Sequence, residues 1–127
     1  MIPFSAAWRK APPARLTRLP TAAVTATGQF IVLCLNPATI VVSIYKTAVG
    51  AALREHKHPF ARYADVLTGT LHVSDTETGH SNVYKAGDFI IQAIGQWHPA
   101  VNLDDRPLQL LVTDQQAGQK SNVVLRN

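Results

Sequence analysis

Short apolar runs recur along most of the chain, and turn-forming residues separate them at intervals of about ten residues. Breaks such as Asn36-Pro37 and Thr78-Gly79 carry the residues that tight turns favour. No segment keeps a helical period for more than two turns. This spacing predicts an all-β fold, either a sandwich or a barrel closed on itself. We expect strands near residues 30–35, 39–46, 51–58, 62–67, 70–75, 81–86, 88–93, 98–103, 108–114 and 121–125.

An irregular arm precedes this pattern. Pro3, Pro12, Pro13 and Pro20 interrupt any long helix at the start of the chain. The residues that follow are enough for one domain with a core and too few for two. We therefore expect an N-terminal arm over residues 1–28 and a single barrel domain over residues 29–127.

The charge distribution argues against several classes of partner. The net charge is +4, and residues 1–54 hold six Lys or Arg and no acid. These basic residues are dispersed among prolines and alanines, without the dense run or interleaved aromatics of a nucleic-acid-binding segment, so no nucleic acid is expected. No run approaches the about 18 apolar residues that cross a bilayer, so no integral membrane association is expected. A secretory signal is not supported either, which favours the cytoplasm.

Three histidines carry the strongest chemical signal. His56 and His58 have one residue between them, and His98 follows forty residues later. In a strand, alternate side chains lie on the same face, so His56 and His58 would point the same way. A third imidazole from a neighbouring strand would complete a three-nitrogen site for a divalent transition metal, with open positions for water or substrate. Taken singly, each could instead be a hydrogen-bonded histidine of the barrel.

The same segment resembles the first motif of the cupin family. That motif reads Gly, five residues, His-x-His, three or four residues, Glu, six residues, Gly. Gly50, His56, His58 and Gly69 fall on its positions, and Arg62 stands where the family has Glu.

The second cupin motif follows at the right place. It reads Gly, five residues, Pro-x-Gly, two residues, His, three residues, Asn. Gly87, Gly95, His98 and Asn102 match it, and Ala93 replaces the Pro. Eight of the ten defining positions therefore agree at fixed spacing, across about residues 40–114.

The resemblance implies a small antiparallel β-barrel of jelly-roll type, open at one end. It also implies that His56, His58 and His98 hold a divalent transition metal, which across the family can be iron, manganese, nickel, zinc or copper. Arg62 cannot be a fourth ligand, because a guanidinium has no lone pair to give. Three roles for Arg62 stay open: pairing with a nearby acid such as Glu55 or Asp65, anchoring an acidic group of a substrate, or marking a site without metal.

Two functions follow as hypotheses. The first is a metal-dependent enzyme, a dioxygenase or an isomerase, that acts on a small anionic or polar molecule. The alternative is a barrel that binds a small molecule or a metal without turnover, with a metal-free structural barrel as a third reading. Arg62 and Gln96 are the candidate substrate-binding residues, with Gln92 nearby, and no catalytic residue is assigned. A homodimer is expected, because small cupins commonly pair through sheet edges.

Overall fold

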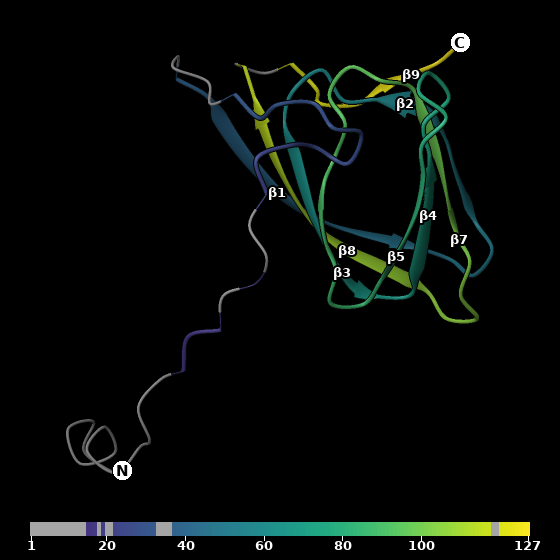
Figure 1. Ribbon diagram of the computed structural model, residues 1–127. Helices are drawn as coiled ribbons and strands as arrows, with labels where there is room; N and C mark the ends of the chain where they lie inside the picture. The colour runs from purple at the N-terminus through teal and green to yellow at the C-terminus, as the bar shows by residue number, and fades with distance from the viewer. Residues whose placement is uncertain (1–14, 18, 20–21, 33–36, 118–119) are drawn as a thin grey trace, which may run out of the picture.

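The computed structural model describes residues 15–17, 19, 22–32, 37–117 and 120–127, and within them the chain folds as an antiparallel jelly roll (Figure 1). The all-β fold expected from the sequence is confirmed. The strands are β1 (Thr39–Thr47), β2 (Ala52–Lys57), β3 (Arg62–Thr68), β4 (Thr70–Ser74), β5 (Ser81–Lys85), β6 (Phe89–Ile91), β7 (His98–Asn102), β8 (Leu108–Gln116) and β9 (Val124–Leu125).

Nine of the ten expected strands correspond to these elements. The tenth, over 30–35, lies partly outside the described residues, and in its described part Phe30 makes only an isolated bridge with Val24. β9 is shorter than expected because Ser121 takes up backbone groups that a strand would use. Its hydroxyl accepts from the amide of Val123 and donates to the carbonyl of the same residue.

The strands form two sheets that face each other across the interior. One sheet has the order β1-β8-β3-β6 and the other β5-β4-β7-β2-β9, and all pairings are antiparallel. Figure 1 shows β3 and β8 on one side of the barrel and β4 and β7 on the other. β9 pairs with β2, so the C-terminal segment lies across one end of the barrel.

The core follows the two-residue alternation of the strands. On β8 every second side chain is buried, beginning with Leu108, Leu110 and Val112. They pack against apolar residues of the facing and neighbouring strands: Ala64, Val66, Leu71, Ile90 and Ala100. The same inward positions continue toward the other end of the barrel as polar residues, among them Arg62 on β3 and Asp114 on β8. A polar site is thereby placed on top of an apolar core.

Gly69, a position of the first motif, joins β3 to β4 with φ of +86°. A Cβ at this position would lie 2.9 Å from the Cα of Leu108. Both the backbone conformation and the close approach of β8 therefore require glycine.

Residues 25–29 cover the free edge of β6. The amide of Ala26 donates to the carbonyl of Ile91 at 2.9 Å, and the Gln29 side chain bonds both backbone groups of Ile94 at 2.8 Å. A sheet edge that would otherwise expose unpaired backbone groups is thus partly occupied by the chain itself. Within the described part of the chain, no helix has the length and apolar character needed to cross a membrane.

Candidate metal centre

The structure brings His56, His58 and His98 together at one end of the barrel. His56 is on β2 opposite His98 on β7, and His58 follows directly after β2. Their ring centroids lie 4.4–4.9 Å apart, and all three side chains are buried, with His58 only 1% exposed. Each ring can offer one nitrogen such that the three lie within 4.8 Å of one another. We call this group the three-histidine site.

The backbone fixes which nitrogen of each ring is free. Every Nδ1 lies within hydrogen-bond distance of a backbone carbonyl oxygen: His56 of Arg54 at 2.6 Å, His58 of Asn122 at 2.8 Å and His98 of Gln96 at 2.9 Å. A carbonyl can only accept, so each Nδ1 carries the proton and each neutral ring keeps a lone pair on Nε2. The Nε2 atoms of His58 and His98 are 3.1 Å apart. Two lone pairs at that separation repel unless a cation or a proton lies between them, which is the arrangement that a metal ion fits.

Burial keeps these rings neutral. It lowers the pKa of His56 and His98 below the ordinary value, and together with the charge of Arg62 it lowers the pKa of His58 to about 2. The neutral imidazole is the form that binds a metal, so at neutral pH the three-histidine site needs no proton release before binding.

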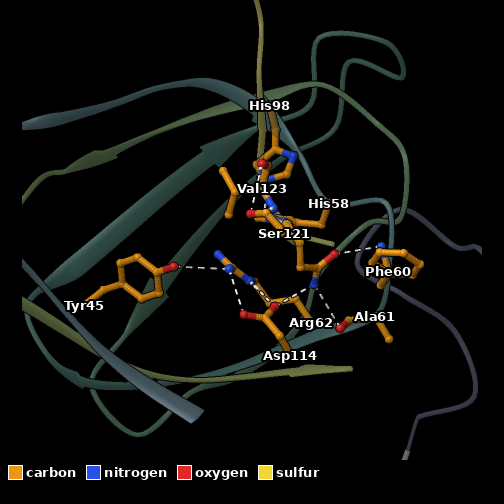
Figure 2. A network of polar contacts seen from close by, with 10 residues as sticks. Tyr45, His58, Phe60, Ala61, Arg62, His98, Asp114, Ser121 and Val123 are labelled. Atoms are coloured by element: carbon orange, nitrogen blue, oxygen red, sulfur yellow. Dashed lines mark hydrogen bonds and ion pairs between the residues drawn. The ribbon is translucent and has the colours of Figure 1, made fainter. Parts of the chain in front are cut away.

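Arg62, at the position of the missing Glu, is held in a buried ion pair. Its Nε donates to Oδ1 of Asp114 at 2.7 Å and its Nη2 to Oδ2 at 2.9 Å, while Nη2 also lies 3.3 Å from the hydroxyl of Tyr45 (Figure 2). Arg62 and Asp114 are 7% and 4% exposed. Burial alone would lower the pKa of Arg62, but the bonds and charge of Asp114 outweigh it and raise that pKa. The guanidinium therefore keeps its positive charge, and the carboxylate of Asp114 balances it.

The acid that pairs with Arg62 is not one of those suggested by the sequence. Glu55 pairs with Arg126 at the surface, and Asp65 occupies the opposite parity on β3 from Arg62. Asp114 is the Cα partner of Arg62 in the β3–β8 ladder. The sequence alone predicts that Asp114 faces inward, because it continues the inward alternation of Leu108, Leu110 and Val112.

Asn122 connects this ion pair to the three-histidine site. Its Nδ2 donates to Oδ1 of Asp114 at 2.6 Å, and its Oδ1 accepts the amide of Phe60 at 2.7 Å. Its backbone carbonyl is the one that accepts from His58. No pattern in the sequence marks this residue, since it lies just before the short strand β9 and outside both motifs.

A cavity of about 140 Å³ adjoins the three-histidine site. Its apolar walls include Leu71, Leu110 and Val112, and the C-terminal segment contributes Val123 and Leu125. Its polar lining includes the three histidines, Arg62, Tyr45 and Gln92.

The two glutamines near His98 have different places. Gln92 is among the described residues that line the cavity, whereas Gln96 is not. The Gln96 side chain instead accepts a hydrogen bond from the hydroxyl of Thr27 at 2.7 Å. Its backbone carbonyl, however, orients His98.

A sequence profile described as the cupin domain matches residues 43–114, which contain both motifs and Asp114. The chain belongs to the cupin family. The matched segment covers more than half of the chain, so the resemblance seen in the sequence is confirmed. No curated protein sequence matches this cupin significantly.

Solved cupin structures share the fold at low sequence identity. The polyketide cyclase RemF from Streptomyces resistomycificus has a TM-score of 0.57 at 17% identity, over 69% of this chain and 62% of its own. Oxalate decarboxylase from Bacillus subtilis, a protein with Mn(II) centres, has a TM-score of 0.58 at 23% identity, over 68% and 24%. A sugar phosphate isomerase of the cupin superfamily from Silicibacter pomeroyi has a TM-score of 0.52 at 23% identity, over 61% and 51%. This cupin thus spans less than two thirds of these three proteins, and the likeness shows the fold.

Proposed function

We propose that this cupin binds a divalent transition metal through His56, His58 and His98 and acts on a small molecule held in the adjoining cavity. One observation carries the proposal: three buried neutral imidazoles have their Nδ1 atoms fixed by backbone carbonyls, which leaves three Nε2 lone pairs in one small region. When bound, the metal supplies Lewis-acid or redox chemistry. The candidate ions are iron, nickel, zinc and copper, which imidazole suits, and manganese, because the fold relative oxalate decarboxylase has Mn(II) centres.

We propose a dioxygenase or an isomerase as the reaction class. The solved relatives include an oxidase, a decarboxylase, an isomerase and a cyclase. Several types of reaction therefore occur on this fold, and a dioxygenase or an isomerase is compatible with it. This chain contributes a small cavity that is partly open to solvent, polar at the histidines and apolar beyond them. Such a cavity can orient a small molecule with its polar end toward the three-histidine site.

Arg62 has a limited role toward substrate in this proposal. Asp114 occupies its Nε and one Nη, so Arg62 can offer only its remaining N–H groups to a polar or anionic group in the cavity. Gln92, which lines the cavity, is the second polar residue that we place against substrate. Gln96 acts through its backbone carbonyl, which orients His98.

The alternative is a barrel that retains a small ligand or a metal without turnover. The closed Arg62–Asp114 pair supports it, because this pair leaves few charged groups free to act on a bound molecule. Metal-loaded protein that binds ligands with a spectral change, but converts none of a panel of thiols, keto acids and catechols, would favour this alternative.

Elemental mass spectrometry tests the proposed metal centre. Untagged protein purified without nickel resin should carry close to one metal ion per chain. The variant His56→Ala should lose it, whereas His72→Ala, which changes a histidine outside the three-histidine site, should keep it. A wild type that is empty and also refuses added iron, manganese and zinc would refute the proposal.

We also propose that the protein is a homodimer. The outward side chains of the edge strand β1 are apolar and half-exposed, namely Ile40, Val42 and Ile44. An edge strand with such a face favours pairing with a second copy. Light scattering at micromolar concentration tests this, and a monomeric mass would contradict it.

A further inference from the structure

A second, smaller cavity also borders His98. Its volume is about 20 Å³, which is room for one water molecule. Val73, Gln92 and His98 line both this cavity and the larger one, so the two cavities adjoin at these side chains. The small cavity is also lined by Asp75, Asn82 and Tyr84, which bring polar groups to it.

Asp75 has one carboxylate oxygen with an evident structural role and one without. Its Oδ1 accepts the amides of Glu77 at 3.0 Å and Thr78 at 2.8 Å, which fixes the turn between β4 and β5. Its Oδ2 is buried and has no hydrogen-bond partner among the described residues. The whole residue is only 6% exposed.

A buried carboxylate oxygen without a partner is unfavourable for folding and calls for an explanation in a native structure. One water in the small cavity would donate a hydrogen bond to Oδ2, but it would not balance the charge. The positive charge of Arg62 is already balanced by Asp114, and Glu55 is paired at the surface with Arg126. Among the residues that the structure describes, Asp75 is therefore the buried acid without a cationic partner, and it lines the small cavity together with His98.

The three-histidine site has the opposite imbalance. Three neutral imidazoles around a divalent ion leave two positive charges in the barrel, and the carboxylate that cupins carry in the first motif is absent. The negative charge of Asp75 already acts on His98, where it opposes the burial that lowers the pKa of that ring. A buried anion close to a bound cation interacts strongly, since little water lies between them.

We propose that Asp75 is the buried counter-charge of the three-histidine site, and that its unpartnered Oδ2, hydrated in the small cavity, strengthens cation binding there. This inference rests on the proposed metal-binding function. Asp75 does not ligate the ion in this account. It is a positioning residue that acts through His98 and through the electric field in the barrel.

The variant Asp75→Asn separates this role from support of the turn. An asparagine oxygen can still accept the amides of Glu77 and Thr78, so the turn is retained while the charge is removed. Asp88→Asn is the matched control, because Asp88 accepts the amide of Lys85 in an exposed turn, and it is not among the described residues that line either cavity. Asp75→Ser, which can also accept an amide in the turn, provides a second variant if the first fails to fold.

The affinity for Zn(II), measured by competition with a chromophoric chelator, and the melting temperature of the metal-free protein are the two readouts. Asp75→Asn should bind Zn(II) at least about tenfold more weakly than the wild type, whereas Asp88→Asn should not change the affinity. The metal-free Asp75→Asn should melt at or above the wild-type temperature, because an unpaired buried charge has been removed. If Asp75 only supported the turn, Asp75→Asn would lower the melting temperature of the metal-free protein.

Each contrary result has a separate meaning. Equal Zn(II) affinity in wild type and Asp75→Asn would overturn the counter-charge role and leave the three-histidine site standing. A metal-free Asp75→Asn that melts below the wild type would assign Asp75 to the turn and also overturn the inference. A wild type that binds none of Zn(II), Mn(II) and Fe(II) would refute the metal-binding function, and the counter-charge role with it.

Discussion

Replacing Asp114 by asparagine removes the charge that neutralises Arg62 while keeping the size of the side chain. The two groups are 4% and 7% exposed, so water and salt screen the pair very little. The guanidinium would lose a bidentate contact of 2.7 and 2.9 Å. The side-chain amide of asparagine has only one acceptor oxygen, and its NH₂ group would face an N–H donor of Arg62.

The expected loss follows from this geometry. Removing one partner of a buried ion pair typically costs about 3–5 kcal/mol, because the other charge stays buried without compensation. In a chain of 127 residues, about 1 kcal/mol shifts the melting temperature by about 4 °C. We therefore expect Asp114→Asn to lower the melting temperature of the metal-free protein by about 12–20 °C.

Urea unfolding with a chelator present measures the effect, and two controls define it. Replacing both partners, as in Arg62→Met with Asp114→Leu, should restore most of the stability, because no buried charge is then left unpaired. Glu55→Gln breaks a pair at the surface and should leave the unfolding midpoint nearly unchanged. If Asp114→Asn unfolds within about 1 kcal/mol of the wild type, the reasoning about a buried, fully engaged pair is wrong.

Two further predictions concern pH and the first motif. The pKa of His58 is about 2 in the folded protein and about 6.5 in the unfolded chain. Between these pH values His58 is therefore protonated in the unfolded chain and neutral in the folded protein. Stability should therefore fall as the pH drops below 6.5, by about 3 kcal/mol at pH 4.5 from His58 alone, and urea titrations showing no pH dependence between 7 and 4.5 would contradict this. Gly69→Ala should destabilise the protein more than Gly79→Ala, because both have positive φ but only at Gly69 would the new Cβ meet a backbone atom, at 2.9 Å. Equal melting temperatures for these two variants would count against the close packing of β8 on the β3–β4 turn.

Much of the fold could be predicted from local pattern. The alternation in β8 places Leu108, Leu110 and Val112 on one face, and the structure buries all three. The one-residue gap between His56 and His58 placed them on one face by the same rule, and the structure brings both beside His98. These features depend only on the period of a strand and on motif spacing.

The partners of the site depend on pairings between distant segments, and these were not predictable. Asp114 meets Arg62 because β3 and β8 pair in one particular register over a separation of 52 residues. Asn122 reaches both Asp114 and His58 only because the C-terminal segment crosses the end of the barrel. The lack of a hydrogen-bond partner at Oδ2 of Asp75 likewise depends on where the fold positions every nearby donor.

Nitrogen-15 NMR of the histidine side chains tests the central claim most directly, because it reports which ring nitrogen carries the proton and which one binds metal. In the metal-free protein near neutral pH, His56, His58 and His98 should all be neutral with the proton on Nδ1. Adding Zn(II) should shift the Nε2 signals of these three rings and leave His72 and His80 unchanged. Protonated Nε2 in two or more of the three rings, or zinc-induced shifts confined to His72 and His80, would contradict the three-histidine metal centre.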